Sequence, residues 1–172
     1  MKSQLSVYFI GILFFMLVGA DAAQAQYNGT ALGIRGGARG GLTIKGMGKG
    51  PGAIEGIVGF YPNSLNVTVL WEHYQNAFDV QNLYWYYGLG GHAAFYNTLN
   101  NGRYPRWYGD AAFDDTGIGL GVDAILGLEY LIQTELPFDL AVSVDAIPFL
   151  EVNTAGGAYF WVDPGLGVKV VF

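Results

Sequence analysis

The chain has 172 residues and combines 27 glycines and 16% aromatic residues with only 13% charged residues. A soluble domain typically carries about 25% charged residues, so this chain is poor in charge for a protein that faces water. The net charge of −6 argues against a nucleic-acid-binding protein, which needs a basic face. The absence of cysteine excludes disulfide bonds and cysteine-ligated metal sites.

The start of the chain has the pattern of a secretory signal peptide. An apolar run over residues 7–18 is followed by the small-residue ending Ala23-Gln24-Ala25. The run is shorter than the roughly 20 residues that a transmembrane helix needs, and the cleavage pattern follows it directly. We therefore expect a signal peptide over residues 1–25 and one mature domain over residues 26–172.

The mature chain is apolar but has no segment suited to a membrane-spanning helix. No stretch after the leader approaches 18 consecutive apolar residues. Closed β-barrels are the other structures that satisfy every backbone hydrogen-bonding group in lipid. An exported chain with 52% hydrophobic residues and no such helix is therefore typical of a membrane β-barrel.

The expected elements are strands in which polar and apolar side chains alternate, since successive strand residues point to opposite faces. Residues 32–45 form a hairpin whose polar face carries Arg35 and Lys45. The next two strands, AIEGIVGF and LNVTVLWEHY, carry Glu55 and Glu72 on their polar faces. In the four strands that follow, the polar faces hold His92, Asp123, Glu129, Asp139, Ser143, Asp145, Asp163 and Lys169.

Turn-forming residues separate these strands. The breaks are GGARGG, GMGKGPG, YPNS, QNAFDVQN, the long polar stretch over residues 97–116, QTELP and EVNTAGG. Seven connections predict eight strands. Alternation runs unbroken through the first break, so one long strand would fit there equally well, but the even strand number of bacterial outer-membrane barrels favours a hairpin.

The polar faces are too sparse in charge to cover a soluble lipocalin-like barrel, which is the alternative fold. We therefore predict an all-β, eight-stranded antiparallel up-and-down transmembrane barrel with its polar faces inward. The predicted polar network of the lumen consists of Arg35, Lys45, Glu55, Glu72, His92, Asp123, Glu129, Asp139, Asp145 and Lys169. Aromatic pairs near strand ends, such as Trp71 with Tyr74 and Phe160 with Trp161, are predicted to lie at the lipid interfaces.

The leader, the eight alternating strands, the single long loop and the C-terminal sequence resemble the small outer-membrane β-barrels of Gram-negative bacteria, of the OmpX and OmpA-barrel type. The resemblance covers the mature chain in pattern only. It implies an outer-membrane location, contact with outer-membrane lipid, and insertion by the outer-membrane assembly machinery. The assembly signal would be the C-terminal residues Val168, Val170 and Phe172. The resemblance implies no activity.

Catalysis and cofactor binding find little support in the sequence. Ser143, His92 and Asp145 share a face, but no spacing shows that they meet as a nucleophile, base and acid would have to. GMGKGPG lacks the end of a phosphate-binding loop, and DAAFDDTG lacks the spacing of a calcium loop. We predict no enzyme, cofactor or metal. A narrow ion channel and a lipid-modifying enzyme remain alternatives.

We expect the long loop over residues 97–116 to be the contact surface. Arginine and aromatic side chains are enriched where proteins bind their partners. The candidate surface contacts are Arg103, Tyr104, Arg106, Trp107, Tyr108 and Phe113. These side chains would otherwise cap the barrel mouth or enter the lipid interface. We expect a monomer with a structural or surface-interaction role and an extracellular ligand that the sequence does not identify.

Overall fold

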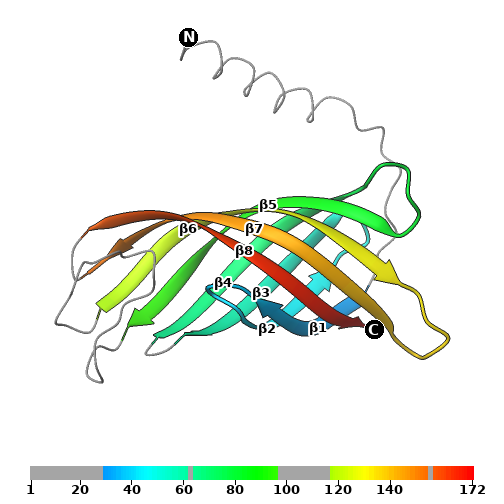
Figure 1. Ribbon diagram of the computed structural model, residues 1–172, viewed down its shortest axis with the longest axis horizontal. Helices are drawn as coiled ribbons and strands as arrows, with labels where there is room; N and C mark the ends of the chain where they lie inside the picture. Colours follow the sequence, from blue (N-terminus) through cyan, green and yellow to red (C-terminus); the bar gives the residue numbers. More distant parts are fainter. Residues whose placement is uncertain (1–28, 62–63, 97–116, 155–156) are drawn as a thin grey trace, which may run out of the picture.

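The computed structural model describes residues 29–61, 64–96, 117–154 and 157–172. They form eight strands in an up-and-down barrel, in which each strand pairs antiparallel with the next and β8 pairs with β1 (Figure 1). The strands are β1 (Gly29–Gly36), β2 (Gly41–Met47), β3 (Gly52–Tyr61), β4 (Ser64–Asn76), β5 (Leu83–Tyr96), β6 (Gly117–Ile132), β7 (Asp139–Asn153) and β8 (Ala158–Val171).

The predicted all-β, eight-stranded barrel is therefore confirmed. Each of the seven predicted connections separates two strands, and the first is a true hairpin turn between β1 and β2. The predicted signal peptide lies outside the described residues. Within the described ranges, no helix has the length and apolar character needed to cross a membrane.

The two ends of the barrel differ in the connections that lie there. We call the end where β1 begins and Phe172 lies the base, and the opposite end the rim (Figure 1). Antiparallel order places the connections after β2, β4 and β6 at the base. The connections after β1, β3, β5 and β7, including residues 97–116, start and end at the rim.

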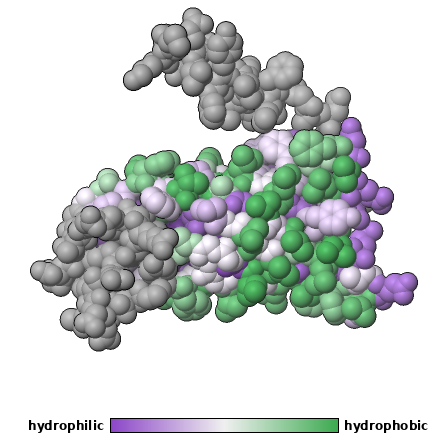
Figure 2. Space-filling model, viewed as in Figure 1, coloured by the Kyte–Doolittle hydropathy of each residue, from purple (hydrophilic) through white to green (hydrophobic). Residues whose placement is uncertain are grey.

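The barrel wall is apolar outside and polar inside. Burial alternates residue by residue along the strands, as in β6, where Leu120 and Val122 are 62% and 64% exposed while Asp123 is 3% exposed. Apolar side chains cover much of the visible wall, and polar residues gather at the base (Figure 2). This polarity is the reverse of that of a water-soluble barrel.

Inward-facing glycines make room for the large side chains of the lumen. A Cβ atom added to Gly165 would lie 2.5 Å from Cζ of Arg35, and one added to Gly127 would lie 2.5 Å from Cζ of Tyr86. Both distances are shorter than real Cβ contacts, so a side chain at either position would displace its neighbour. The high glycine content is thus partly explained by the packing of a narrow barrel.

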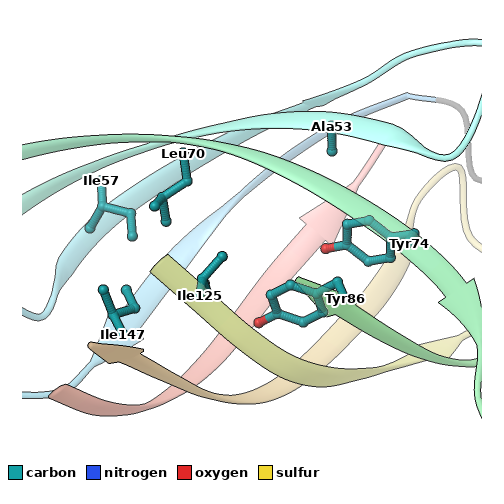
Figure 3. Packing of buried hydrophobic residues seen from close by; sticks show 7 residues of the cluster. All are labelled: Ala53, Ile57, Leu70, Tyr74, Tyr86, Ile125 and Ile147. Atoms are coloured by element: carbon teal, nitrogen blue, oxygen red, sulfur yellow. The ribbon is translucent and has the colours of Figure 1, made fainter. Parts of the chain in front are cut away.

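Apolar side chains also fill part of the lumen. One cluster joins Ala53, Ile57, Leu70, Tyr74, Tyr86, Ile125 and Ile147 from β3 to β7 (Figure 3). The rings of Tyr74 and Tyr86 stack with their centroids 5.0 Å apart. The prediction that Tyr74 lies at the lipid interface is therefore wrong, because an even position on β4 points inward and leaves this ring only 4% exposed.

Candidate functional site: the charged lumen

The barrel lumen is the only place where the described strands concentrate ionisable side chains. Every Asp, Glu, Lys and Arg in these strands is buried, with the exception of the half-buried Asp139. Counting the turn residue Arg39, seven buried carboxylates share the lumen with four cationic side chains and His92. The buried carboxylates belong to Glu55, Glu72, Asp123, Glu129, Asp145, Glu151 and Asp163, and the cations to Arg35, Arg39, Lys45 and Lys169.

A first group of charges, which we call the rim cluster, centres on Arg35. Its Nη2 atom lies 2.6 Å from Oδ1 of Asp145 on β7, and its Nη1 atom lies 2.8 Å from Oδ2 of Asp163 on β8. The cluster consists of Arg35, Arg39, His92, Asp123, Asp145, Glu151 and Asp163. Buried ions need such partners, because an isolated charge in a low-dielectric interior costs many kcal/mol.

The turn between β1 and β2 is hydrogen-bonded to this cluster. The backbone amides of Ala38 and Arg39 donate to the carboxylate of Asp163, at 2.7 and 3.2 Å. The Arg39 side chain turns inward, where Nη2 donates to Asp123 at 2.8 Å and the guanidinium lies 4.0 Å from the ring centre of Phe149. The first turn thus directs a charged side chain into the lumen.

His92 lies between two carboxylates. Its Nδ1 atom is 2.8 Å from Oδ2 of Asp123, and its Nε2 atom is 2.9 Å from Oε2 of Glu151. The hydroxyl of Tyr96 donates to the same Glu151 carboxylate at 2.9 Å. Since both ring nitrogens face carboxylates, the imidazole is held rigidly by its neighbours and serves as a structural partner for two acids.

A second group, the base cluster, centres on Lys45 and Lys169. The ammonium of Lys45 lies 2.9 Å from Glu55 and 2.8 Å from Glu72, and it donates to the hydroxyl of Tyr74 at 2.6 Å. The ammonium of Lys169 lies 3.1 Å from Glu129. The base cluster consists of Lys45, Glu55, Glu72, Glu129 and Lys169.

The structure places nine residues of the predicted lumen network inside the barrel and divides them between the two clusters. They are Arg35, Lys45, Glu55, Glu72, His92, Asp123, Glu129, Asp145 and Lys169. Asp139 differs, because it lies at the first position of β7 near the base. There its Oδ1 atom accepts a hydrogen bond from the backbone amide of Thr134 at 2.9 Å.

Sequence reasoning missed Arg39 and Glu151. Arg39 is in the glycine-rich turn between two strands, but it has the same odd-numbered parity as Arg35 and Lys45, so alternation continued through the turn would have placed it on the polar face. Glu151 shares the odd-numbered face of β7 with Asp145, so alternation would have found it had the strand been extended past Phe149. The candidate surface contacts of the loop over residues 97–116 lie outside the described residues.

Within the described part of the lumen, Ser143 and His92 do not form a hydrogen bond with each other. Ser143 lies 3.5 Å from the ammonium of Lys169, whereas both nitrogens of His92 bind Asp123 and Glu151 rather than this serine. Ser143, His92 and Asp145, which share a face in the sequence, therefore do not form a hydrogen-bonded group. Across the described ranges, no group of three or more histidine and carboxylate side chains has the arrangement of a metal site.

The C-terminal residues of the predicted assembly signal lie on the outer wall. Val168 and Phe172 are 50% and 63% exposed, and Val170 is half-buried. Comparisons with protein-family models, with characterised proteins and with solved structures give no match to this chain.

Proposed function

We propose that this chain is an integral outer-membrane β-barrel, monomeric and filled by its own side chains, with a structural or surface-interaction role. The observation that carries the proposal is the reversed polarity of the wall. Every Asp, Glu, Lys and Arg of the described strands except the half-buried Asp139 is buried, whereas residues such as Ile34, Leu120 and Leu166 are at least 60% exposed on the outside.

Energetics favour lipid outside this wall. An exposed apolar belt in water leaves each large side chain without its gain from burial, roughly 1.5–3 kcal/mol per residue. In a bilayer the same belt is solvated by acyl chains, and the inward charges avoid the cost of roughly 2–4 kcal/mol for a lysine or arginine at the bilayer midplane. These two terms support a membrane protein over a soluble lipocalin-like carrier.

The packing of the lumen supports a structural role over a channel. Ion pairs between Arg35, Lys45, Lys169 and their carboxylates cross the interior, and the rings of Tyr74, Tyr86 and Phe149 are buried among them. An eight-stranded barrel has an interior that side chains fill, and this one follows that rule. We therefore propose that the connections at the rim, above all residues 97–116, make the surface interactions.

The experiment is electrophoresis of the protein from separated cell fractions, with and without boiling. We expect it in the outer-membrane fraction, with a different mobility when unheated, because a closed membrane barrel resists dodecyl sulfate until it is heated. Recovery in the soluble periplasmic fraction without a mobility shift would contradict the proposal and favour the lipocalin-like carrier. Trimming residues 97–116 in a barrel that keeps its heat shift then tests the surface role.

A further inference from the structure

The barrel wall is uneven in height. β1 and β2 have 8 and 7 residues, whereas β6, β7 and β8 have 16, 15 and 14. A strand that crosses a bilayer needs about 9–11 residues. At an axial rise of about 2.5 Å per tilted residue, β1 is about 20 Å tall, which is less than the apolar band of about 25 Å of an outer-membrane barrel.

The shortfall lies at the rim. Pairing between β1 and β8 ends at Gly36 with Leu166, although β8 continues to Ala158. In Figure 1, β1 and β2 stay in the half of the barrel nearer the C-terminus, and β7 and β8 run almost its full length. Among the described strands, none forms a backbone ladder with the β1-facing edge of β8 over residues 158–165, although the Arg35 guanidinium donates to the backbone carbonyl of Asp163 at 3.1 Å. We call residues 160–162 the open edge of β8.

This open edge carries polar backbone groups. The reciprocal hydrogen bonds between Thr30 and Phe172 show that the even-numbered residues of β8 turn their amide and carbonyl groups toward β1. By the same alternation, Phe160 and Val162 turn theirs toward the open edge, while Pro164 has no amide hydrogen to offer. Acyl chains cannot satisfy such groups, so leaving them unpaired in hydrocarbon is strongly unfavourable.

The exposed apolar side chains also cover a shorter length of β1 than of the longer strands. On β1, only Leu32 and Ile34 are large, apolar and exposed, whereas on β6 such residues extend from Ile118 to Ile132. On the rim side of Ile34, β1 ends at Gly36, and the turn that follows donates two backbone hydrogen bonds to the Asp163 carboxylate. On β1, the exposed apolar surface therefore ends at Ile34, whereas Phe160 and Val162 of the neighbouring β8 are exposed beyond it, next to backbone groups that no described strand pairs.

We infer that the bilayer is thinned beside β1, β2 and the open edge of β8, where headgroups and water descend to the turn over residues 37–40. The partner of this surface is the lipid bilayer itself, deformed on one side of the barrel. Bilayers accommodate a short apolar stretch by thinning, at a modest energetic cost. Hydrating the open edge of β8 offsets that cost. The inference rests on the proposed membrane location.

The test uses spin labels, for which the cysteine-free chain gives no background. One label is placed by Val162→Cys at the open edge, and the matched control by Val122→Cys on β6. Both side chains are exposed, and Val162 precedes the end of β8 by about as many residues as Val122 precedes the end of β6. The purified barrel is reconstituted in phosphatidylcholine vesicles with 14-carbon chains, and label relaxation by oxygen and by a water-soluble nickel chelate is compared.

We expect the ratio of oxygen to nickel accessibility to be several-fold higher for the label at residue 122 than for the label at residue 162. A second edge variant, Phe160→Cys, should resemble Val162→Cys. Equal, oxygen-dominated ratios at all three positions would overturn the thinning while leaving the membrane location intact. An edge label inaccessible to both reagents would overturn it in favour of a second chain paired with β8. Nickel-dominated ratios everywhere would contradict the membrane location itself.

Discussion

Arg35 on β1 and Asp163 on β8 meet across the seam that closes the barrel, with Nη1 of the arginine 2.8 Å from Oδ2 of the carboxylate. The backbone ladder of this seam stops at Gly36 and Leu166, so the pair extends the closure toward the rim. The same carboxylate also binds the backbone amides of Ala38 and Arg39. One side chain therefore joins the first strand, the first turn and the last strand.

Replacing this carboxylate should weaken the barrel. Asp163→Asn leaves the buried Arg35 with one carboxylate partner in place of two, and removing one partner of a buried ion pair costs about 3–5 kcal/mol. We expect a drop of that order in the free energy of unfolding, measured by urea titration in lipid vesicles. Asp139→Asn is the control, since this half-buried side chain at the base belongs to neither cluster. Equal stability of the two variants would show that the seam does not depend on Asp163.

The base cluster makes a prediction about charge balance. Lys45→Met leaves Glu55 and Glu72 without their shared ammonium, and we expect a loss of about 3–5 kcal/mol in the free energy of unfolding. Adding Glu72→Gln to this variant removes one of the two carboxylates left without the Lys45 ammonium, and it should recover part of the lost free energy of unfolding. Lys49→Met, at an exposed turn position, is the matched control and should change little. No recovery in the double variant would contradict the pairing of Lys45 with Glu72.

The inward glycines predict a steric effect. Gly165→Ala places a methyl group against the guanidinium of Arg35, whereas at the outward Gly36 the nearest atom to an added Cβ is the Leu166 carbonyl oxygen at 3.7 Å. Overpacking of a filled interior costs about 1–3 kcal/mol. Thermal unfolding followed by the electrophoretic shift should therefore occur at a lower temperature for Gly165→Ala than for Gly36→Ala. The same temperature for both variants would mean that the lumen is loosely packed at Arg35.

A filled lumen should not conduct. The ion pairs of Arg35 and Lys45 and the buried rings of Tyr86 and Phe149 occupy the interior, so we expect no stepwise current when the purified barrel is added to planar lipid bilayers. A large-pore porin added to the same bilayers provides the positive control. Discrete, cation-selective openings would instead support the narrow channel, to which the excess of buried carboxylates would contribute selectivity.

Much of this architecture follows from two-residue alternation. Leu140, Val142 and Val144 oppose Ser143 and Asp145 in the sequence, and they do so in β7. Alternation predicts which face of the strand a side chain lies on, but it does not predict which residue that side chain contacts. It therefore could not show that Asp145 binds Arg35, 110 positions earlier in the chain. That pairing depends on the register between β1, β8 and β7. Arg39 has the parity of Arg35 and Lys45, but it lies in a turn between two strands, so its hydrogen bond to Asp123 required the structure.

The most direct test of the central claim is to ask which methyl groups touch lipid. The barrel, with protonated methyl groups in a deuterated background, is placed in lipid nanodiscs, and nuclear Overhauser effects to the acyl chains are recorded. We predict cross-peaks from the outward residues Val122, Val142 and Val144 and none from the inward residues Ile57, Ile125 and Ile147. Acyl contacts from the inward set, or from neither set, would contradict a barrel whose apolar wall faces lipid and whose charges fill its lumen.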